Sequence, residues 1–566
     1  MLFDNPMRHL LFLLCLPLYG AASLTVSGPS LAVDGVTLTV PLSGCTSPLS
    51  PSSGILGFTA VSNLRGGTVL TISTAAASGC TVTLTLSEPV SRQEAPVTIT
   101  LASTTGANYL TDASANTPAG SSNVSVANNS DWLYVTSSAF LSNARAEGYH
   151  LSSSQYPNQL EFLSADGCLR FNSTTTKLDI FTFNFGNHWV LRQDGTQVFD
   201  WGVSAGAATW TSQGLVSGLS GSHEYAVCSV AAQSPYPDIF RIRIDAGTLG
   251  VRPAAKKLIA AAGDSLRQYY GAQSLTDSRL GDVFQVANAL GAANQYYGLA
   301  GAQICNLTTS IPTKLTFPNG ENFAVALLAW SGGGNDVSAG ATPPQLAACY
   351  TTLLNNITGL ANPPRKIIVE GLPPEATPYS QTYDDAIKSV VAGYANAVFV
   401  STTLPVWINN TVNAGNCSDA GDRQTDGIHI EGCAAGTHVG YSKVADIEQP
   451  IVYSALTGSP TYSFSGPITG TVGLPVSFTI TLATGRFSGI VTLTPSDGSG
   501  GKFSPAGVTP TSGSSTTIVY TPIGAGSKTI RISASADTGW VSPAGSVFTA
   551  TPATSIQVPR NFLLAQ

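Results

Sequence analysis

The sequence predicts a multidomain chain in which an α/β domain with a parallel sheet is flanked by all-β domains. Short apolar runs alternate with segments of helical spacing over residues 256–450, which is typical of strand–helix–strand crossovers. On either side of this segment, β-branched residues recur with period two between clusters of Gly, Ser, Pro and Asn. That pattern is typical of β-sandwiches.

The all-β parts are expected at residues 23–128, 129–252 and 460–553, followed by a tail at 554–566. The second part is richer in aromatic residues and predicts a sandwich or jelly roll. Within it, residues 177–201 predict two strands that meet at a turn around 193–195. The third part predicts an immunoglobulin-like sandwich, and it holds no Cys.

The α/β domain is expected at residues 253–457. Its predicted strands are 257–263, 294–298, 322–330, 365–373 and 397–405. Its predicted helices are 277–292, 343–360, 382–396 and 434–452. Functional sites of parallel sheets form at the carboxyl ends of the strands.

Composition narrows the possible functions. Charged residues make up 10% of the 566 residues, and the net charge is −7 with no cluster of Lys and Arg. Nucleic-acid binding needs a basic stripe, so we expect no nucleic-acid partner. The hydrophobic content of 43% is ample for packed cores.

Residues 1–22 predict a secretory signal peptide. Arg8 precedes an apolar run at 10–18, and the small residues that follow place the cleavage site near Ala22. The run is shorter than the roughly 20 residues that span a bilayer, which disfavours a membrane anchor. No later stretch is long and apolar enough to span, so we expect a secreted or cell-surface protein.

The cysteines agree with export. The chain has nine Cys, of which Cys15 lies in the predicted signal, so eight remain. In an exported protein these are expected to form disulfides. Sequential pairing is favoured over an alternative with some buried free thiols. The pairs would be Cys45 with Cys80, Cys168 with Cys228, Cys305 with Cys349, and Cys417 with Cys433.

Four short stretches follow predicted strands or precede the last helix. They are Gly263-Asp264-Ser265, the turn from Gly298 to Gly301, Gly333-Gly334-Asn335-Asp336, and Asp426-Gly427-Ile428-His429. Each alone is usually a plain turn. Taken together, their residue types fit nucleophilic catalysis, because a serine hydroxyl needs a base such as His to remove its proton.

Roles follow from these residue types. Of the six His, His429 and His438 fall in the α/β domain, and His438 is expected inside the last helix with a structural role. This leaves His429 as the base, which Asp426 would orient. The Ser265 N–H, Gly301 and the Asn335 amide are the expected oxyanion-hole donors. A loop-capping Asn335 and a left-handed turn at Gly301 are the ordinary alternatives.

The four stretches resemble the blocks of the SGNH hydrolases, the GDSL esterase and lipase superfamily. The resemblance covers roughly residues 256–450 and assigns Ser265, Gly301, Asn335, Asp426 and His429 to the family's functional positions. The glycine block is the loosest match, and Gly298 is its alternative. The Pro that usually follows the His is replaced by Ile430. The resemblance implies a flavodoxin-like parallel sheet in a three-layer α/β sandwich.

Ser331 is a second candidate nucleophile. Residues 329–333 nearly match the G-x-S-x-G elbow around it, but that elbow needs a helix directly after the serine. The glycines at 332–334 oppose a helix, which favours Ser265. No H-E-x-x-H pattern or Cys/His spacing predicts a metal or cofactor. Asp419, Asp422 and Asp426 offer a calcium alternative that is less favoured than a solvated acidic loop.

The sequence therefore predicts an exported carboxylic ester hydrolase with a Ser265–His429–Asp426 triad. The order of an aromatic β region before the α/β domain also resembles bacterial carbohydrate esterases. It implies short-chain, acetyl esters on polysaccharide as substrate. The alternatives are a lipase or polyester hydrolase of the same superfamily, or a non-catalytic surface protein that binds carbohydrate. The disulfides Cys305–Cys349 and Cys417–Cys433 would limit movement of the catalytic loops.

Overall fold

The computed structural model describes most of the chain between residues 23 and 554. The described residues are 23–62, 68–94, 96–147, 149–151, 159–162, 167–184, 186–203, 209–230, 238–264, 278–315, 325–328, 333–372, 381–402, 407–409, 411, 417, 421–424, 428–434, 437–484, 491–510, 515–535 and 537–554. The chain divides into two compact units, Met1–Tyr134 with Arg243–Ala246, and Val135–Ile242 with Gly247–Gln566. The five-part division expected from the sequence stays a prediction.

The first unit is built on β-strands whose residues alternate between buried and exposed. Along β3, Leu38, Val40 and Leu42 point into the core and the intervening residues do not, which is the pattern of a sheet with one buried face. In the described residues the strands run in the order β5-β4-β8-β9-β2-β3-β7-β6, with β1 beside β3. Their bounds are β1 Thr25–Val26, β2 Ser30–Leu31, β3 Thr37–Ser43, β4 Phe58–Ser62, β5 Thr68–Leu70, β6 Ile72–Ser78, β7 Thr81–Leu86, β8 Val97–Leu101 and β9 Ser121–Asn128, and the short β10 Trp132–Tyr134 follows.

The second unit begins with two antiparallel sheets. One has the order β11-β14-β20-β16-β17, and the other has the order β12-β13-β21-β15-β18 with β19 beside β15. Their bounds are β11 Ala144–Glu147, β12 Tyr149–Leu151, β13 Leu160–Phe162, β14 Cys168–Ser173, β15 Lys177–Asn184, β16 His188–Gln193, β17 Thr196–Val203, β18 Thr209–Ser212, β19 Val216–Ser217, β20 His223–Ser229 and β21 Asp238–Ile244, and the short helix α1 covers Ser138–Leu141.

One expectation for this region was wrong. Residues 177–201 do not form two strands but belong to three, because β15 and β16 separate at Gly186, where φ is +63°. Glycine adopts that left-handed conformation without the strain of a Cβ. As a result, β15 and β16 lie in different sheets. The turn expected around 193–195 is present between the antiparallel strands β16 and β17.

The α/β part contains a five-stranded sheet in which every pair of neighbours is parallel. Its order is β23-β22-β24-β25-β26, so β22, which comes first in the sequence of this sheet, lies between β23 and β24. The bounds are β22 Leu258–Gly263, β23 Ala293–Gly298, β24 Val325–Leu328, β25 Ile367–Glu370 and β26 Ala397–Val400. β22 and β25 are buried along their whole length, as expected for strands covered on both faces.

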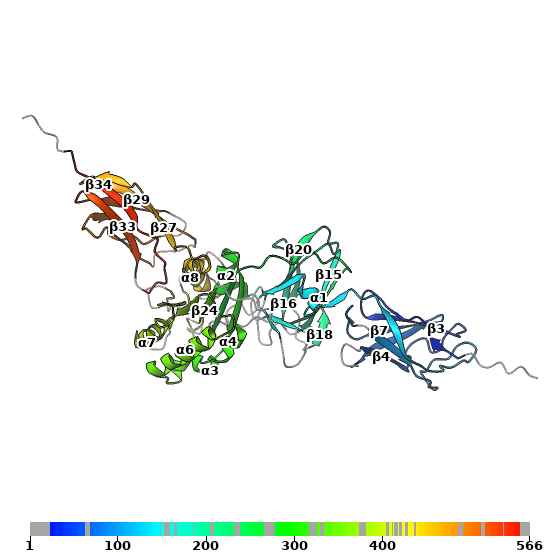
Figure 1. The fold of residues 1–566 in the computed structure, drawn as a ribbon. Coiled ribbons are helices and arrows are strands. Elements are labelled where there is room, and N and C mark those ends of the chain that lie inside the picture. The colour runs from blue at the N-terminus through cyan, green and yellow to red at the C-terminus, as the bar shows by residue number, and fades with distance from the viewer. Residues whose placement is uncertain are drawn as a thin grey trace, which may run out of the picture. The chain divides into compact units, whose positions relative to one another are not determined.

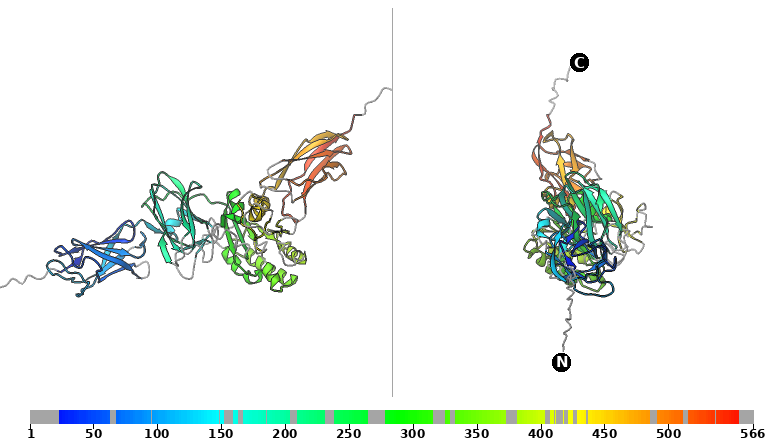
Figure 2. Two further views of the ribbon diagram at one scale, coloured as in Figure 1. Left: turned by 180° about the vertical axis from the view of Figure 1, so that it is seen from behind. Right: turned by 90° about the vertical axis from the view of Figure 1, so that its right-hand side faces the viewer.

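Helices cover both faces of this sheet (Figures 1 and 2). Helix α8 packs on α2 and β24, whereas α6 packs on α3, α4 and α7. The helix bounds are η3 Ser278–Leu280, α2 Asp282–Ala289, α3 Ile304–Leu307, α4 Ser310–Lys314, α5 Gly334–Ser338, α6 Pro343–Thr358, α7 Gln381–Val391 and α8 Gly440–Thr457. Helix α6 begins with Pro343 after Thr342, which forms a capping box with Gln345.

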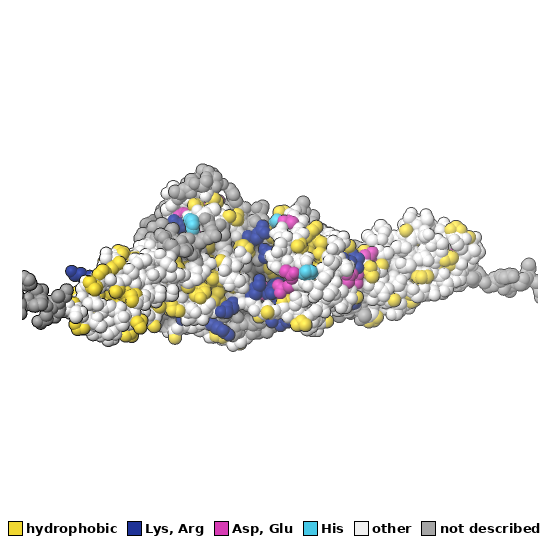
Figure 3. All heavy atoms as spheres, turned by 90° about the horizontal axis from the view of Figure 1, so that it is seen from above, with side chains coloured by type: hydrophobic (Ala, Val, Ile, Leu, Met, Phe, Trp, Pro, Cys, Tyr) yellow, Lys and Arg dark blue, Asp and Glu magenta, His cyan; other side chains and the backbone are white. Residues whose placement is uncertain are grey.

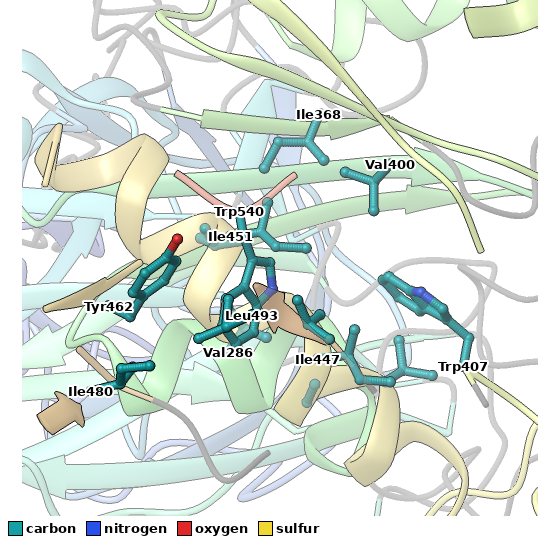
Figure 4. Packing of buried hydrophobic residues seen from close by; sticks show 14 of the residues in the cluster. Val286, Ile368, Val400, Trp407, Ile447, Ile451, Tyr462, Ile480, Leu493 and Trp540 are labelled. Atoms are coloured by element: carbon teal, nitrogen blue, oxygen red, sulfur yellow. The ribbon is translucent and has the colours of Figure 1, made fainter. Parts of the chain in front are cut away.

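Two four-stranded sheets complete the second unit, in the orders β27-β29-β32-β31 and β28-β34-β33-β30. Their bounds are β27 Tyr462–Ser465, β28 Thr469–Thr471, β29 Val476–Leu482, β30 Leu493–Ser496, β31 Lys502–Ser504, β32 Thr516–Thr521, β33 Gly526–Ala534 and β34 Ser546–Thr551. Residues from both sheets share one buried cluster with residues of α2, α8 and the parallel sheet. Figure 4 shows Tyr462, Leu493 and Trp540 beside Ile451 and Ile447 of α8.

The described cysteines form four disulfides, Cys45–Cys80, Cys168–Cys228, Cys305–Cys349 and Cys417–Cys433. These are the sequential pairs that the sequence favoured. Cys168 and Cys228 are direct partners on the neighbouring strands β14 and β20. The predicted signal peptide, residues 1–22, lies outside the described residues. No helix within the described ranges is both long enough and apolar enough to cross a membrane.

Candidate functional site

Three of the predicted blocks follow strands that are neighbours in the sheet. Asp264 follows β22, Gly301 lies shortly after β23, and Asn335 lies in α5 after β24. Because β22 lies between β23 and β24 and all three are parallel, their carboxyl ends meet at one edge of the sheet. From β22 the chain continues to β23 on one side, whereas from β24 it continues to β25 on the other side. Parallel sheets usually form binding sites where the direction of the strand order reverses in this way.

The side chain of Asn335 links the three blocks directly. Its Nδ2 donates to Asp264 Oδ2 at 3.2 Å and to the Ala302 carbonyl at 3.0 Å. The Ala302 carbonyl has no proton to donate, which fixes the orientation of the amide. Asp264 adjoins Ser265 in the chain, and Ala302 adjoins Gly301. Since an amide has two N–H donors and both are engaged here, an oxyanion would have to displace one of these acceptors.

Asp336 supports the residues that follow the glycine turn. Its carboxylate is 2% exposed and accepts the backbone N–H groups of Ile304 at 2.7 Å and Cys305 at 3.1 Å. These N–H groups lie at the start of α3, where helical donors lack internal partners. Cys305 is joined in turn to Cys349 of α6. We call residues 298–305 and 333–338 the glycine–asparagine side of the site.

Buried carboxylates near this side raise the pKa of a neighbouring hydroxyl. Burial raises the pKa of the Tyr350 hydroxyl, and the carboxylates of Asp336, Asp384 and Asp264 raise it further. Tyr350 lies in α6 and is fully buried. Its hydroxyl therefore stays protonated and does not provide a base or a nucleophile.

The glycine turn has the geometry that requires Gly. Gly301 has a φ of +69°, a left-handed conformation that L side chains rarely adopt. No atom lies within 4 Å of the position that a Cβ would occupy there. The Ala302 N–H closes the turn by donating to the Leu299 carbonyl at 3.0 Å. Gly298, the alternative, is the buried last residue of β23.

A cavity of about 460 Å³ adjoins this side. It is lined by the disulfide Cys305–Cys349, by Asp336, and by residues around the α5–α6 connection. Neither Gly301 nor Asn335 lines it. The cavity therefore adjoins the glycine–asparagine side without including these two residues.

The other side of the site, residues 422–434, carries His429. Arg423 and Ile430 form an antiparallel β-bridge, and we refer to the described residues 421–424 and 428–434 around it as the hairpin. The Gln424 backbone N–H donates to the His429 carbonyl at 2.8 Å, and Gln424 Nε2 donates to the Ile430 carbonyl at 2.7 Å. Arg423 is fully buried and donates from Nη1 to the Ile428 carbonyl. We call residues 422–434 the histidine side.

The base of this hairpin is anchored by Asp422, which is 1% exposed. Its carboxylate accepts the N–H groups of Asn409 at 2.8 Å and Gly440 at 2.9 Å, and the Lys443 ammonium at 2.7 Å. Gly440 begins α8. The anchor therefore fixes the hairpin to the start of that helix, where a negative charge is favourable.

A second anchor places the histidine side near the same edge of the sheet. Gln285 Nε2 donates to the Cys433 carbonyl at 2.9 Å. Gln285 lies in the first turns of α2, the helix that follows β22 in the chain and so begins near the strand's carboxyl end. Cys433 is also joined to Cys417.

The predicted residues have different outcomes. Gly301, Asn335 and His429 lie at the positions described above, while Ser265 and Asp426 lie outside the described residues. The triad therefore stays a prediction. Sequence reasoning missed the roles of Asp264 and Asp336, although both stand inside the GDS and GGND blocks. It also missed Arg423, and nothing in the local pattern distinguishes that residue.

One subsidiary expectation was wrong. His438 is not inside the last helix, because α8 begins at Gly440, and its Nδ1 instead lies 2.5 Å from Asp446 Oδ2. The expectation that no helix directly follows Ser331 is not contradicted, because α5 begins only at Gly334, after Gly333 adopts a φ of +122°. Ser331 and Gly332 lie outside the described residues, so the preference for Ser265 over Ser331 stays a prediction.

Within the described part of the chain, no three His, Cys, Asp or Glu side chains gather as a metal site would require. Asp419 and Asp426, which belonged to the calcium alternative, fall outside that part. The third member, Asp422, is engaged with Lys443 and two backbone N–H groups.

Comparison with known proteins gives similarity at the level of solved structures. A family two carbohydrate esterase from Cellvibrio japonicus is 13% identical, covers 57% of this chain and 97% of its own, and has a TM-score of 0.41. A carbohydrate esterase family 2 enzyme with a carbohydrate-binding domain from Corynascus thermopiles (Myceliophthora fergusii) is 20% identical, covers 56% and 100%, and has a TM-score of 0.40. A GDSL-like lipase from Bacteroides ovatus is 13% identical, covers 52% and 86%, and has a TM-score of 0.36.

The chain is therefore similar to solved structures described as carbohydrate esterases and as a GDSL-like lipase. No family model and no curated protein matches the chain. At such identities and TM-scores, the chemistry of this chain has to be argued from its own residues.

Proposed function

We propose that this protein is an exported serine esterase of the SGNH hydrolase type. Ser265 Oγ attacks the ester carbonyl while His429 takes its proton, and Asp426 orients the imidazole. The oxyanion is bound by the Ser265 N–H, the Gly301 turn and the Asn335 amide, which gives up one of its two acceptors, Asp264 or Ala302, to do so. His429 then gives the proton to the leaving alcohol, and water releases the acid from the acyl-enzyme.

The observation that carries the proposal is the pair of hydrogen bonds from Asn335 to Asp264 and Ala302. They connect blocks that are separated by 71 and 33 positions in the chain. Plain turns have no reason to converge in this way. A loop-capping role for Asn335 is not favoured, because its amide bonds to residues of two other loops.

The sheet order supports the same proposal. Numbered along the chain, β23-β22-β24-β25-β26 is the order 2-1-3-4-5 of flavodoxin-like sheets. We extend this to a three-layer α/β domain at residues 253–457, a sandwich or jelly-roll domain before it, and an immunoglobulin-like domain at 460–553. Residues 1–22 are proposed as a signal peptide, and the four disulfides suit an oxidising compartment.

The proposed substrate is a short-chain, acetyl ester on a polysaccharide. The low content of charged residues, 10%, favours an uncharged substrate. The similar structures include a carbohydrate esterase in complex with cellohexaose and an acetyl xylan esterase. That ligand and that activity belong to those proteins, and they suggest the substrate class to test here.

The test is hydrolysis of p-nitrophenyl acetate by the full chain, compared with Ser265→Ala and with Ser331→Ala. We expect Ser265→Ala to lose at least about 10³-fold in kcat, as loss of a catalytic nucleophile does. Ser331→Ala should retain activity. Loss of activity only in the Ser331 variant would show that Ser331, and not Ser265, is the nucleophile. An inactive wild type would favour a non-catalytic carbohydrate-binding protein.

A further inference from the structure

The outermost strand of one sheet has an unusual surface. Among the described strands, β17 (Thr196–Val203) forms the edge of the order β11-β14-β20-β16-β17 and is exposed along most of its length. Exposed edge strands normally carry charges that discourage association. Here Val198, Phe199 and Val203 are exposed by 47%, 39% and 53%. Apolar side chains that gather in this way usually mark a binding surface.

Two aromatic rings on this strand pack edge to face. The ring centroids of Phe199 and Trp201 lie 5.3 Å apart, and the planes are inclined by 72°. Trp201 Nε1 donates to the Gly214 carbonyl at 3.0 Å, which holds the indole in place. The β16–β17 pairing has two irregularities that leave Val198 and Trp201 without a direct partner residue in the register. Such bulges re-aim side chains of an edge strand.

Polar groups that can bind hydroxyls lie on the same strand, at Asp200 and Gln197. Asp200 accepts from the Gly202 N–H at 2.7 Å and from Gln197 Nε2 at 3.3 Å, and its Oδ1 lies 2.6 Å from His188 Nε2. Burial raises the pKa of Asp200, but the hydrogen bonds from Gly202 and His188 outweigh it and lower the pKa overall. Figure 3 shows that His side chains lie beside acidic side chains on one face of the molecule, with hydrophobic side chains nearby.

The surface also contacts the α/β part of the chain. Arg279 Nη1 donates to Gln197 Oε1 at 3.4 Å. Arg279 lies in η3, shortly before the start of α2. A polymer bound along β17 would therefore lie beside the start of α2.

We propose that Gln197, Phe199, Asp200 and Trp201 bind sugar rings of an uncharged polysaccharide whose ester groups are hydrolysed at the proposed site. This inference rests on the proposed function and deepens it by assigning the polymer a binding surface. A pyranose ring has an apolar C–H face that packs on an aromatic ring, and hydroxyls around its rim that bond to carboxylate and amide groups. Charged polymers are not favoured, because the Asp200 carboxylate is paired with His188 and lies near Arg279.

The binding test uses the full chain with Ser265→Ala, so that it does not depend on turnover. Its affinity for deacetylated xylan is measured with and without Phe199→Ala. We expect a loss of about tenfold with Phe199→Ala, since about 1.4 kcal/mol is a factor of ten. Phe199→Tyr should restore binding because it keeps the ring. Ile468→Ala removes a side chain that is 73% exposed elsewhere and serves as the control.

The kinetic test compares acetylated xylan with p-nitrophenyl acetate, which has no sugar. Phe199→Ala should lower the ratio of kcat/KM for xylan over the small ester about tenfold, mainly through KM. Unchanged xylan affinity in Phe199→Ala, or equal loss with Ile468→Ala, would overturn the inference. So would a wild type that dimerises through this strand, with Phe199→Ala monomeric and still binding xylan. If xylan binding is lost as expected while no form hydrolyses either ester, the proposed function fails and the binding surface stands.

Discussion

Both sides of the site have a buried carboxylate that accepts backbone N–H groups, Asp336 on one side and Asp422 on the other, but the histidine side adds a buried guanidinium. On the glycine–asparagine side, the carboxylates of Asp264 and Asp336 accept hydrogen bonds from an amide and from backbone N–H groups. On the histidine side, the guanidinium of Arg423 and the amide of Gln424 donate to backbone carbonyls. A turn that directs N–H groups inward needs an acceptor, and a hairpin that directs carbonyls inward needs a donor, because buried backbone groups must be paired.

This difference shows how loops of irregular backbone become fixed at the edge of a sheet. Each side is also closed by one disulfide, Cys305–Cys349 or Cys417–Cys433. Side-chain supports of this kind position catalytic groups more accurately than the loop backbone would alone. Substitutions on each side can show which supporting side chains affect the kinetics of the site and which affect only the free energy of unfolding.

The largest effect is expected from Arg423→Met on the histidine side. The substitution leaves the Ile428 carbonyl without its buried guanidinium donor and should reduce the free energy of unfolding by about 3 kcal/mol. The kcat/KM for p-nitrophenyl acetate should fall at least about tenfold in protein that remains folded. Denaturant unfolding and steady-state kinetics measure the two effects.

Arg252→Met is the matched control, because Arg252 Nε donates to the Ala144 carbonyl at 2.9 Å outside the site. It should change stability and leave kcat/KM intact. An Arg423→Met protein with wild-type kinetics would show that the histidine side needs no support from this residue.

Asp336→Asn should have the next largest effect, on the glycine–asparagine side. The amide can accept through only one oxygen and loses the charge, so one of the N–H groups of Ile304 and Cys305 is weakened. We expect a loss of about 1–2 kcal/mol in stability and a fall in kcat with little change in KM.

Asp112→Asn provides the comparison for this variant. Asp112 belongs to the first compact unit, where it accepts the N–H groups of Thr46 at 2.7 Å and Asn116 at 2.8 Å. The substitution should be destabilising without any change in kcat. Equal kinetic effects in the two variants would contradict a local role for Asp336.

The smallest effect concerns a carboxylate-supported loop that lies outside the site. Asp497 accepts from Ser499, Gly501 and the Tyr520 hydroxyl, and although burial raises its pKa, these hydrogen bonds lower it to about 2. A folded-state pKa below the unfolded value of about 3.9 gives stability that is present above about pH 4 and lost as the pH falls toward 2. Asp497→Asn should cost about 1 kcal/mol at neutral pH and flatten this dependence.

Thermal unfolding of wild type and Asp497→Asn between pH 7 and pH 2 measures the effect. The two proteins should converge as the pH falls. A constant difference at every pH would mean that the charge of Asp497 contributes nothing.

The sequence predicted the parallel sheet and the positions of three blocks because each depends on local signals. The apolar runs at 257–263 and 365–373 and the Pro at the start of 343–360 mark their elements directly. The supports were not predictable in the same way. Arg423 reads as one charge in a polar loop, and only tertiary packing makes it a buried donor to Ile428.

The separation of β15 from β16 was also beyond the sequence pattern. Both segments have strand composition, and period-two alternation does not say which sheet a strand joins. The left-handed turn at Gly186 decides it. His438 was misplaced for a similar reason, since the helical spacing extends before Gly440, whereas His438 has a φ of +59° and precedes the helix.

The buried cluster that joins α8 to the last two sheets has a practical consequence for anyone who shortens this chain. Val400, Ile451 and Trp540 belong to that one cluster, and a Cβ on Gly539 would lie 2.7 Å from Val400 Cγ2. The Ser401 N–H also donates to the Asp537 carbonyl at 2.8 Å. A truncated chain that ends near residue 458 would expose these apolar side chains to water and tend to aggregate. Replacing the final two sheets with another domain would therefore require redesign of the apolar contacts that Val400 and Ile451 make with them.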